Sequence, residues 1–140
     1  MSNEGLFGAE PSLDEADALL ISVYQRAGRT LDDLPYTTDF DGICTAVDMP
    51  HRTVLHRLMN LRKAGKLPRM GRAPSLAVRL EAEEEQHLLR MVVDAAGSVG
   101  QRDQLPYTSA FDAIVQGFNA ETGRSLEAHD VWRLIAKLAK

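Results

Sequence analysis

An internal repeat restricts the possible folds of this chain more than any other feature of its sequence. The segment LPYT at residues 34–37 recurs at residues 105–108, and the Phe-Asp pair and the isoleucine that follow it recur at the same offset of 71 residues. Hydrophobic patterns before and after this segment recur at offsets of 69 and 77 residues. Small insertions in loops account for the change of offset. The sequence therefore predicts two copies of one unit.

Apolar residues spaced three and four apart predict that each unit contains three helices. In the first unit we expect helices at residues 13–27, 38–47 and 50–64, the first of them with a capping box formed by Ser12 and Glu15. A fourth helix is expected at residues 81–96, and the last helix aligns Val131 and Ile135 with Val54 and Leu58. Residues 66–80 contain a Gly-Arg-Ala-Pro turn signal and predict a small β-hairpin.

The expected fold is mostly α, with two tandem trihelical units at residues 12–80 and 81–140, the first carrying the small β-hairpin. Residues 1–11 lack periodicity and are expected to be a flexible tail. The chain has 44% hydrophobic residues, no apolar run long enough to span a membrane, and no signal-peptide pattern at its start. We therefore expect an intracellular, cytoplasmic protein.

The residue types that carry most enzyme chemistry are sparse or scattered. Cys44 is the single cysteine, so neither an internal disulfide nor a cysteine-based zinc site can form. The four histidines are scattered along the chain, and no pair of them with adjacent carboxylates suggests a metal site. Because the sequence also lacks a glycine-rich phosphate loop and a nucleophile with a nearby base, we expect no enzyme activity and no cofactor.

Charge is strongly segregated along the chain. Residues 49–80 hold eight Lys or Arg and no acidic residue, whereas residues 1–48 hold two basic and ten acidic residues. The overall sequence pI is about 5.5. Because binding depends on the charge of one face rather than of the whole chain, the acid-free stretch predicts a partner that is a polyanion.

The third helix of the first unit presents a polar face opposite its core face. With Val54, Leu58 and Leu61 directed inward, the opposite face is suited to reading base edges, with candidates Arg52, Thr53, His56, Asn60 and Lys63. Flanking cations are placed to contact phosphates: Arg57, Arg62, Lys66, Arg69 and Arg72. The corresponding face of the second unit offers His129, Arg133, Lys137 and Lys140 as second-unit candidates. The simpler interpretation of either face is an ordinary solvated helix whose long cations keep the protein soluble.

Residues 46–67, AVDMPHRTVLHRLMNLRKAGKL, resemble the second and third helices and the start of the wing in winged helix-turn-helix DNA-binding domains. The resemblance lies in an alanine before a tight turn, a helix of the type P-x-x-T-V-x-x-x-L-x-x-L, and a terminal glycine. Asp48 stands where such turns often carry glycine, and aspartate tolerates the left-handed conformation. The resemblance implies a recognition helix at residues 50–64 that enters the major groove, followed by a wing.

Taken together, these patterns predict that the protein binds double-stranded DNA and acts in transcription regulation. The alternative is a protein–protein interaction module, or adaptor, whose basic strip docks an acidic partner. RNA is a lesser possibility, because Trp132, Tyr36 and Tyr107 are expected to be core or cap residues without a stacking role. No membrane partner is expected.

Overall fold

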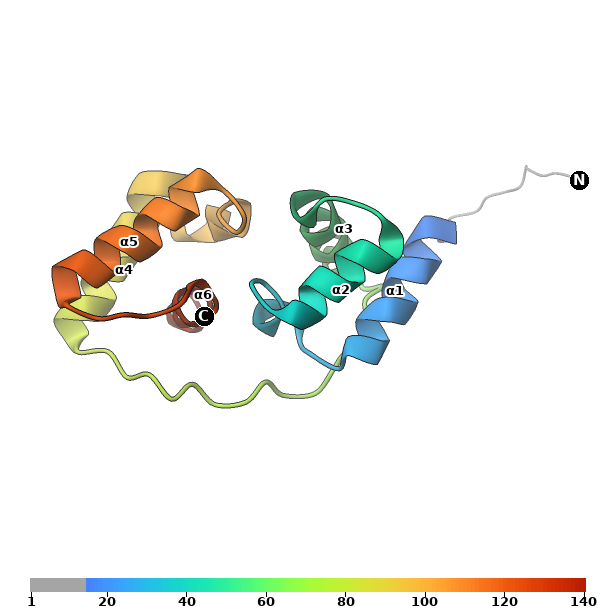
Figure 1. Cartoon of the computed structure of the whole chain (residues 1–140), viewed down its shortest axis with the longest axis horizontal. Helices are drawn as coiled ribbons and strands as arrows, with labels where there is room; N and C mark the ends of the chain where they lie inside the picture. Colours follow the sequence, from blue (N-terminus) through green and yellow to red (C-terminus); the bar gives the residue numbers. More distant parts are fainter. Residues whose placement is uncertain (1–14) are drawn as a thin grey trace, which may run out of the picture.

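The computed structural model describes residues 15–140, and all regular structure in that range is helical (Figure 1). The α-helices are α1 (Glu15–Ala27), α2 (Thr38–Val47), α3 (His51–Lys63), α4 (Ala82–Ala96), α5 (Ser109–Thr122) and α6 (Ala128–Leu138), and two 3₁₀ helices are η1 (Leu31–Asp33) and η2 (Val99–Gln104). The prediction of a mostly α protein is confirmed, and α2 has the predicted bounds. The expected tail and the capping box at Ser12 lie outside the described residues.

The predicted β-hairpin wing is wrong. No strand forms among residues 15–140, and residues 64–81 are an irregular linker that crosses from α3 to α4 (Figure 1). Leu67 and Met70 pack against the core of the first three helices, whereas Leu76 and Val78 pack against the core of the last three. A hairpin would have to fold back on itself, but this segment is held at its two ends by different cores. Its prolines also lack the backbone N–H groups that a strand pair needs.

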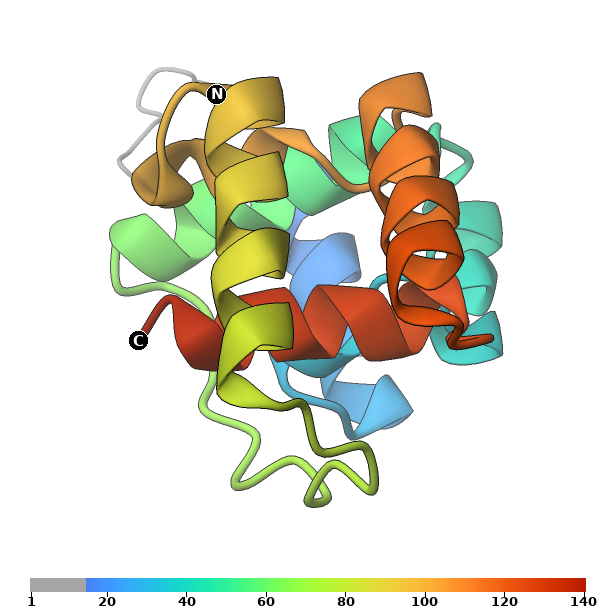
Figure 2. The ribbon, with the colours of Figure 1, turned by 90° about the vertical axis from the view of Figure 1, so that its left-hand side faces the viewer.

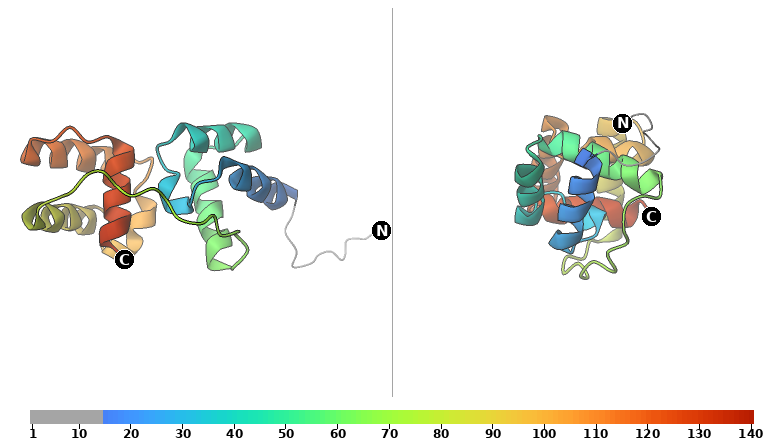
Figure 3. Two further views of the ribbon diagram at one scale, coloured as in Figure 1. Left: turned by 90° about the horizontal axis from the view of Figure 1, so that it is seen from below. Right: turned by 90° about the vertical axis from the view of Figure 1, so that its right-hand side faces the viewer.

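The helices form two halves, each with its own hydrophobic core. In the first half, residues 15–63, the buried side chains include Leu20, Phe40 and Leu58, and in the second half, residues 82–140, they include Phe111 and Trp132. Each core forms because amphipathic helices turn their apolar stripes toward one another. Figures 2 and 3 show α3 and α6 running in the same direction, with their C-terminal ends at the same end of the molecule.

The repeated LPYT segment builds the same helix start twice. The hydroxyl of Thr37 accepts a hydrogen bond from the backbone N–H of Phe40 and donates one to the carbonyl of Leu34. Thr108 makes the equivalent bonds at the start of α5. A threonine cap satisfies a backbone N–H that the first helical turn leaves without a partner. The two helices therefore begin at equivalent positions because the sequence places the same cap before both.

The turn between α2 and α3 has the conformation expected from its sequence. Asp48 ends α2 with φ 55° and ψ 51°, in the left-handed region, and its N–H bonds to carbonyls of the last helical turn. Pro50 then precedes the first residue of α3. This tight turn fixes the angle at which α3 leaves α2, and so determines which side chains of α3 remain exposed.

Candidate functional site

The two halves meet through an exchange of tyrosines. The ring of Tyr36 packs against the second core and the ring of Tyr107 packs against the first, and the two rings stack with centroids 4.3 Å apart. The backbone N–H of each tyrosine donates to the phenolic oxygen of the other. The contact is therefore reciprocal, as in a two-fold symmetric dimer, but both partners belong to one chain. We call this contact the junction.

Both tyrosines have an unusual backbone conformation. Tyr36 and Tyr107 have φ values of 67° and 65°, in the left-handed region that bulky residues rarely occupy. Such a conformation costs on the order of 1–3 kcal/mol and persists only where surrounding contacts maintain it. Here it directs each ring out of its own half and into the other. The expectation that these tyrosines are packing residues agrees with the structure, in which each ring lies against the opposite core and stacks on the other ring.

The first turns of α3 and α6 also contact the opposite half. Nη1 of Arg52 donates to the carbonyls of Asp103 and Pro106, each at 3.1 Å. At the equivalent position of α6, Nε2 of His129 lies 3.1 Å from the carbonyl oxygen of Asp33. Arg52 and His129, the first candidate residues of the two helices, therefore bond to main-chain carbonyls of the opposite half at the junction.

Asp33 is the charged centre of the junction. Its side chain is only 2% exposed, and its carboxylate is 2.9 Å from Nη1 of Arg29, 3.1 Å from Nε2 of His129 and 3.4 Å from Nε of Arg133. A buried carboxylate is stable only when charge-assisted hydrogen bonds replace its hydration. Because Arg29 belongs to the first half and the other two residues to α6, this carboxylate ties the halves together.

The junction predicts a loss of stability at alkaline pH. Burial raises the pKa of Tyr36 to about 12, and it raises the pKa of Tyr107 as well. Unfolded tyrosine ionises near pH 10, so the stabilisation that depends on the neutral phenols is complete below about pH 10 and is lost as the pH rises toward about 12. Urea unfolding followed by Trp132 fluorescence is expected to show this decline. The Tyr36→Phe/Tyr107→Phe variant should be less stable at neutral pH and show a shallower alkaline decline; an equally steep decline would contradict the assignment.

The rest of the predicted base-contacting set forms one exposed stripe on α3. Thr53, His56, Asn60 and Lys63 are all exposed, while Val54, Leu55 and Leu58 are buried on the other side. Nδ2 of Asn60 lies 3.1 Å from Nε2 of His56, so the ring can accept this hydrogen bond when that nitrogen carries no proton. We call these four residues the open face of α3. Arg52 does not belong to it, because its guanidinium faces the second half.

The predicted phosphate-contacting residues divide into two groups. Arg57 and Arg62 are near carboxylates of the first half, with Nη1 atoms 3.5 Å from Asp17 and 3.4 Å from Asp32. Lys66, Arg69 and Arg72 are exposed residues of the linker. Within residues 15–140, neither Arg69 nor Arg72 forms an ion pair. The linker therefore carries a positively charged strip of three exposed cations directly after α3 in the chain, although it is not a wing.

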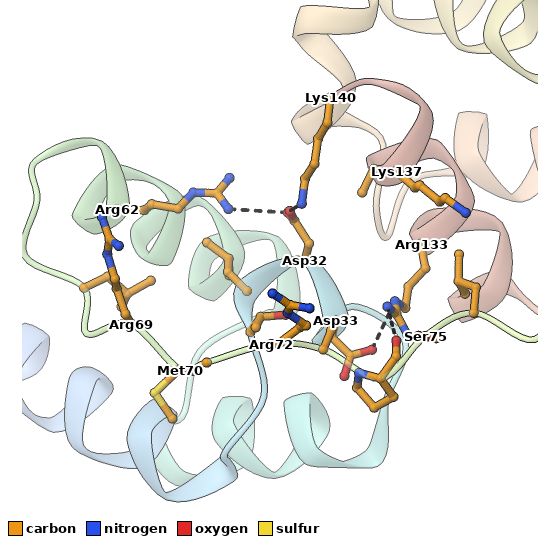
Figure 4. A pocket seen from close by; sticks show the side chains of 18 of the residues that line it. Asp32, Asp33, Arg62, Arg69, Met70, Arg72, Ser75, Arg133, Lys137 and Lys140 are labelled. Carbon is orange, nitrogen blue, oxygen red and sulfur yellow. Dashed lines mark hydrogen bonds and ion pairs between the residues drawn. The ribbon is translucent and has the colours of Figure 1, made fainter.

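The second-unit candidates lie on a different surface from the open face of α3. His129 and Arg133 are engaged at the junction, and Nη2 of Arg133 also donates to the carbonyl of Pro74 at 2.6 Å. Lys137 and Lys140 are exposed at the C-terminal end of α6. Arg133, Lys137 and Lys140 line a cleft of about 1000 Å³ between the linker and the two halves (Figure 4). The same cleft is lined by Arg62, Arg69 and Arg72 of the predicted phosphate-contacting set, but by none of the four residues of the open face of α3.

Comparisons with known proteins identify no relative. The chain matches no protein-family model, and no curated protein and no solved structure is significantly similar to it. Within residues 15–140, no group of three or more His, Cys, Asp or Glu side chains is arranged to hold a metal ion. None of the helices in the same range is both long and apolar enough to cross a membrane. The functional assignment therefore depends on the geometry and charge of the chain itself.

Sequence reasoning missed the role of Arg52 and of Asp33. The helical pattern placed Arg52 correctly on the side of α3 away from its own core, but it could not show that the second half covers that side. In the sequence, Asp33 counts only as one of the ten acidic residues between positions 1 and 48. The signal that could have found it is the repeat itself: Gln104 occupies the equivalent position in the second half, so the acid is present in one copy only.

Proposed function

We propose that this protein binds double-stranded DNA through the open face of α3 and the positively charged linker strip. The observation that carries the proposal is that Lys63, Lys66, Arg69 and Arg72 are exposed on a stretch of 32 residues, 49–80, that contains no acidic side chain. A row of exposed cations next to a helix with polar side chains attracts phosphates and releases the counterions bound to DNA.

The open face of α3 has the chemistry for contacts inside a major groove. Asn60 can donate and accept hydrogen bonds with adenine, and the hydroxyl of Thr53 can bond to several base edges. The major groove is wide enough to admit an α-helix, and these side chains lie on the exposed side of α3. The adjoining Lys63 and Lys66 are then near the sugar–phosphate backbone, where they would hold the helix in register.

The proposed contact differs from the common helix-turn-helix arrangement in one respect. Recognition helices usually contact bases with their N-terminal residues. In this protein Arg52, in the first turn of α3, bonds to carbonyls of the second half. The central and C-terminal parts of α3 are therefore the ones that we propose enter the groove, and Arg52 is left out of the base-contacting set.

A salt titration with random duplex DNA tests the proposal. We expect binding at about 50 mM salt, with log K falling linearly against log salt. Changing Lys63, Lys66 and Arg69 to glutamine should weaken binding to every duplex, and each change should reduce the salt slope by about one. The measurement is fluorescence anisotropy of a labelled duplex.

Arg90→Gln is the matched control, because Arg90 is an exposed cation on α4, outside the proposed strip. It should leave both the affinity and the salt slope nearly unchanged. Equal losses for Arg90→Gln and Lys63→Gln would mean that attraction depends on total charge rather than on this strip. If no duplex binds at about 50 mM salt, the proposal is wrong and the docking of an acidic protein partner becomes the better explanation.

A further inference from the structure

The cleft beneath the linker is lined by positively charged side chains from both halves of the molecule. Its walls are the C-terminal ends of α3 and α6, the η1 helix and the linker, and its volume is about 1000 Å³ (Figure 4). Two carboxylates, Asp32 and Asp33, line it. Seven cations also line it: Arg62, Arg69, Arg72, Arg79, Arg133, Lys137 and Lys140.

The carboxylates of the cleft do not compensate this charge. Asp32 lies between two of the cations, with its oxygens 3.4 Å from Nη1 of Arg62 and 3.5 Å from Nζ of Lys140. Asp33 is engaged with Arg133 at the junction. Of the seven cations five remain in excess, and like charges held around one cleft repel one another. An anion that enters the cleft would relieve this repulsion.

The linker sets the size of the ligand that can enter. Its main chain is fixed at two points, where the carbonyl of Pro74 accepts from Arg133 at 2.6 Å and the carbonyl of Arg79 accepts from Arg124 at 3.0 Å. Arg124 is in turn held by Glu84, whose pKa it lowers to about 2. A segment fixed across the cleft excludes a nucleic-acid duplex, whereas a volume of about 1000 Å³ is typical of small-molecule sites.

We propose that the cleft binds a small ligand that carries several phosphate groups in a row. Several phosphates are needed because the cations come from α3, the linker and α6 and outnumber the carboxylates of the cleft by five, so a single phosphate would leave most of this excess charge unpaired. Arginine predominates in the cleft, and its planar guanidinium matches phosphate oxygens with two parallel hydrogen bonds. The cleft shares Arg69 and Arg72 with the proposed DNA contact, but the proposal does not depend on DNA binding, because Lys137, Lys140 and Asp32 have no part in that contact.

The cleft also has room for an organic group attached to the phosphates. Apolar side chains of the linker line it beside the cations, among them Leu67, Met70, Leu76 and Val78. Inorganic tripolyphosphate and ATP share the same phosphate chain and differ only in this organic part. Comparing the two ligands therefore shows whether the site recognises the phosphate chain alone or a nucleotide.

Isothermal titration calorimetry with tripolyphosphate on the full chain tests the proposal. We expect saturable binding of one equivalent, with inorganic phosphate binding at least about a hundredfold more weakly because it makes fewer charged contacts. The Lys137→Gln/Lys140→Gln variant should bind at least about tenfold more weakly. Asp32→Asn should bind several-fold more tightly, because it removes the carboxylate that competes for Arg62 and Lys140.

Lys63→Gln is the matched control. Lys63 occupies the position in α3 that Lys140 occupies in the second repeat, but it does not line the cleft. It should leave tripolyphosphate binding unchanged while it weakens DNA binding, so the two proposals can fail separately. The cleft proposal would be overturned by no binding of tripolyphosphate at about 1 mM in low salt, by unchanged binding in the Lys137→Gln/Lys140→Gln variant, or by an equal loss in Lys63→Gln.

Discussion

Leu58→Ala is expected to lower the free energy of unfolding by about 2–5 kcal/mol, and Ile135→Ala by a similar amount. Both side chains are fully buried, one in each core, and they occupy equivalent positions of the repeat. Truncation removes buried apolar surface and leaves a cavity that the surrounding helices fill only in part. Leu19→Ala, at a residue that is 46% exposed, is the control and should change stability by less than about 1 kcal/mol.

The same variants test whether the halves unfold together. Trp132 is the single tryptophan and lies in the second core, so its fluorescence reports on the second half. Because the tyrosine exchange and Asp33 couple the halves, Leu58→Ala in the first half should also shift the Trp132 transition in urea. A Trp132 transition that does not move in Leu58→Ala would show that the second half unfolds independently of the first.

Asp33→Ala is expected to destabilise the protein by about 2–3 kcal/mol. The change leaves Arg29, His129 and Arg133 without the carboxylate that now holds them. These three side chains are 33%, 25% and 16% exposed, so water can partly replace the lost bonds. The cost should therefore stay below the value of about 3–5 kcal/mol that is typical when a fully buried ion pair is broken.

Asp39→Ala separates the junction from an ordinary surface ion pair. Asp39 also bonds to Arg29, at 2.6 Å, but its side chain is 45% exposed and this ion pair lies within the first half. An exposed pair of this kind contributes less than about 1 kcal/mol. Chemical unfolding of the two variants under the same conditions makes the comparison, and equal losses of stability would refute a special role for Asp33.

The helices were predictable because their signals are local. The spacing of Val54, Leu55 and Leu58 fixes one face of α3, and the structure buries all three. The alternation of apolar and polar residues is a property of short windows, so neighbours that are distant in the sequence do not change it. The start of α2 after Thr37 and the left-handed Asp48 follow from local backbone chemistry in the same way.

The linker shows where local signals were insufficient. Residues 66–80 carry a good turn signal, but a hairpin forms only if both of its arms lie on one surface. Leu67 and Leu76 instead pack against different cores. The positions of the two cores depend on the junction, and nothing within the linker sequence describes the junction. The predicted wing was therefore overturned by long-range packing.

Which candidate residues are exposed was predicted in part. The exposed state of His56, Asn60 and Lys63 agrees with the helical pattern, whereas the engagement of Arg52 with Asp103 does not follow from it. Whether these residues contact DNA stays a prediction that the salt titration tests. The cleft could not be predicted from the sequence, because its cations come from α3, the linker and the C-terminal part of the chain, and only the fold brings these segments together.

The sequence by itself determined the helices, their caps, the duplication and the concentration of positive charge between residues 49 and 80, since each of these depends on residues close together in the chain. The tertiary structure alone decided how the two copies meet. The rings of Tyr36 and Tyr107 each pack against the core of the opposite half. Asp33 is buried between the halves, and the linker lies over a cleft lined by cations. These features depend on contacts between residues about 45 to 100 positions apart in the sequence, and a local periodicity does not specify such contacts.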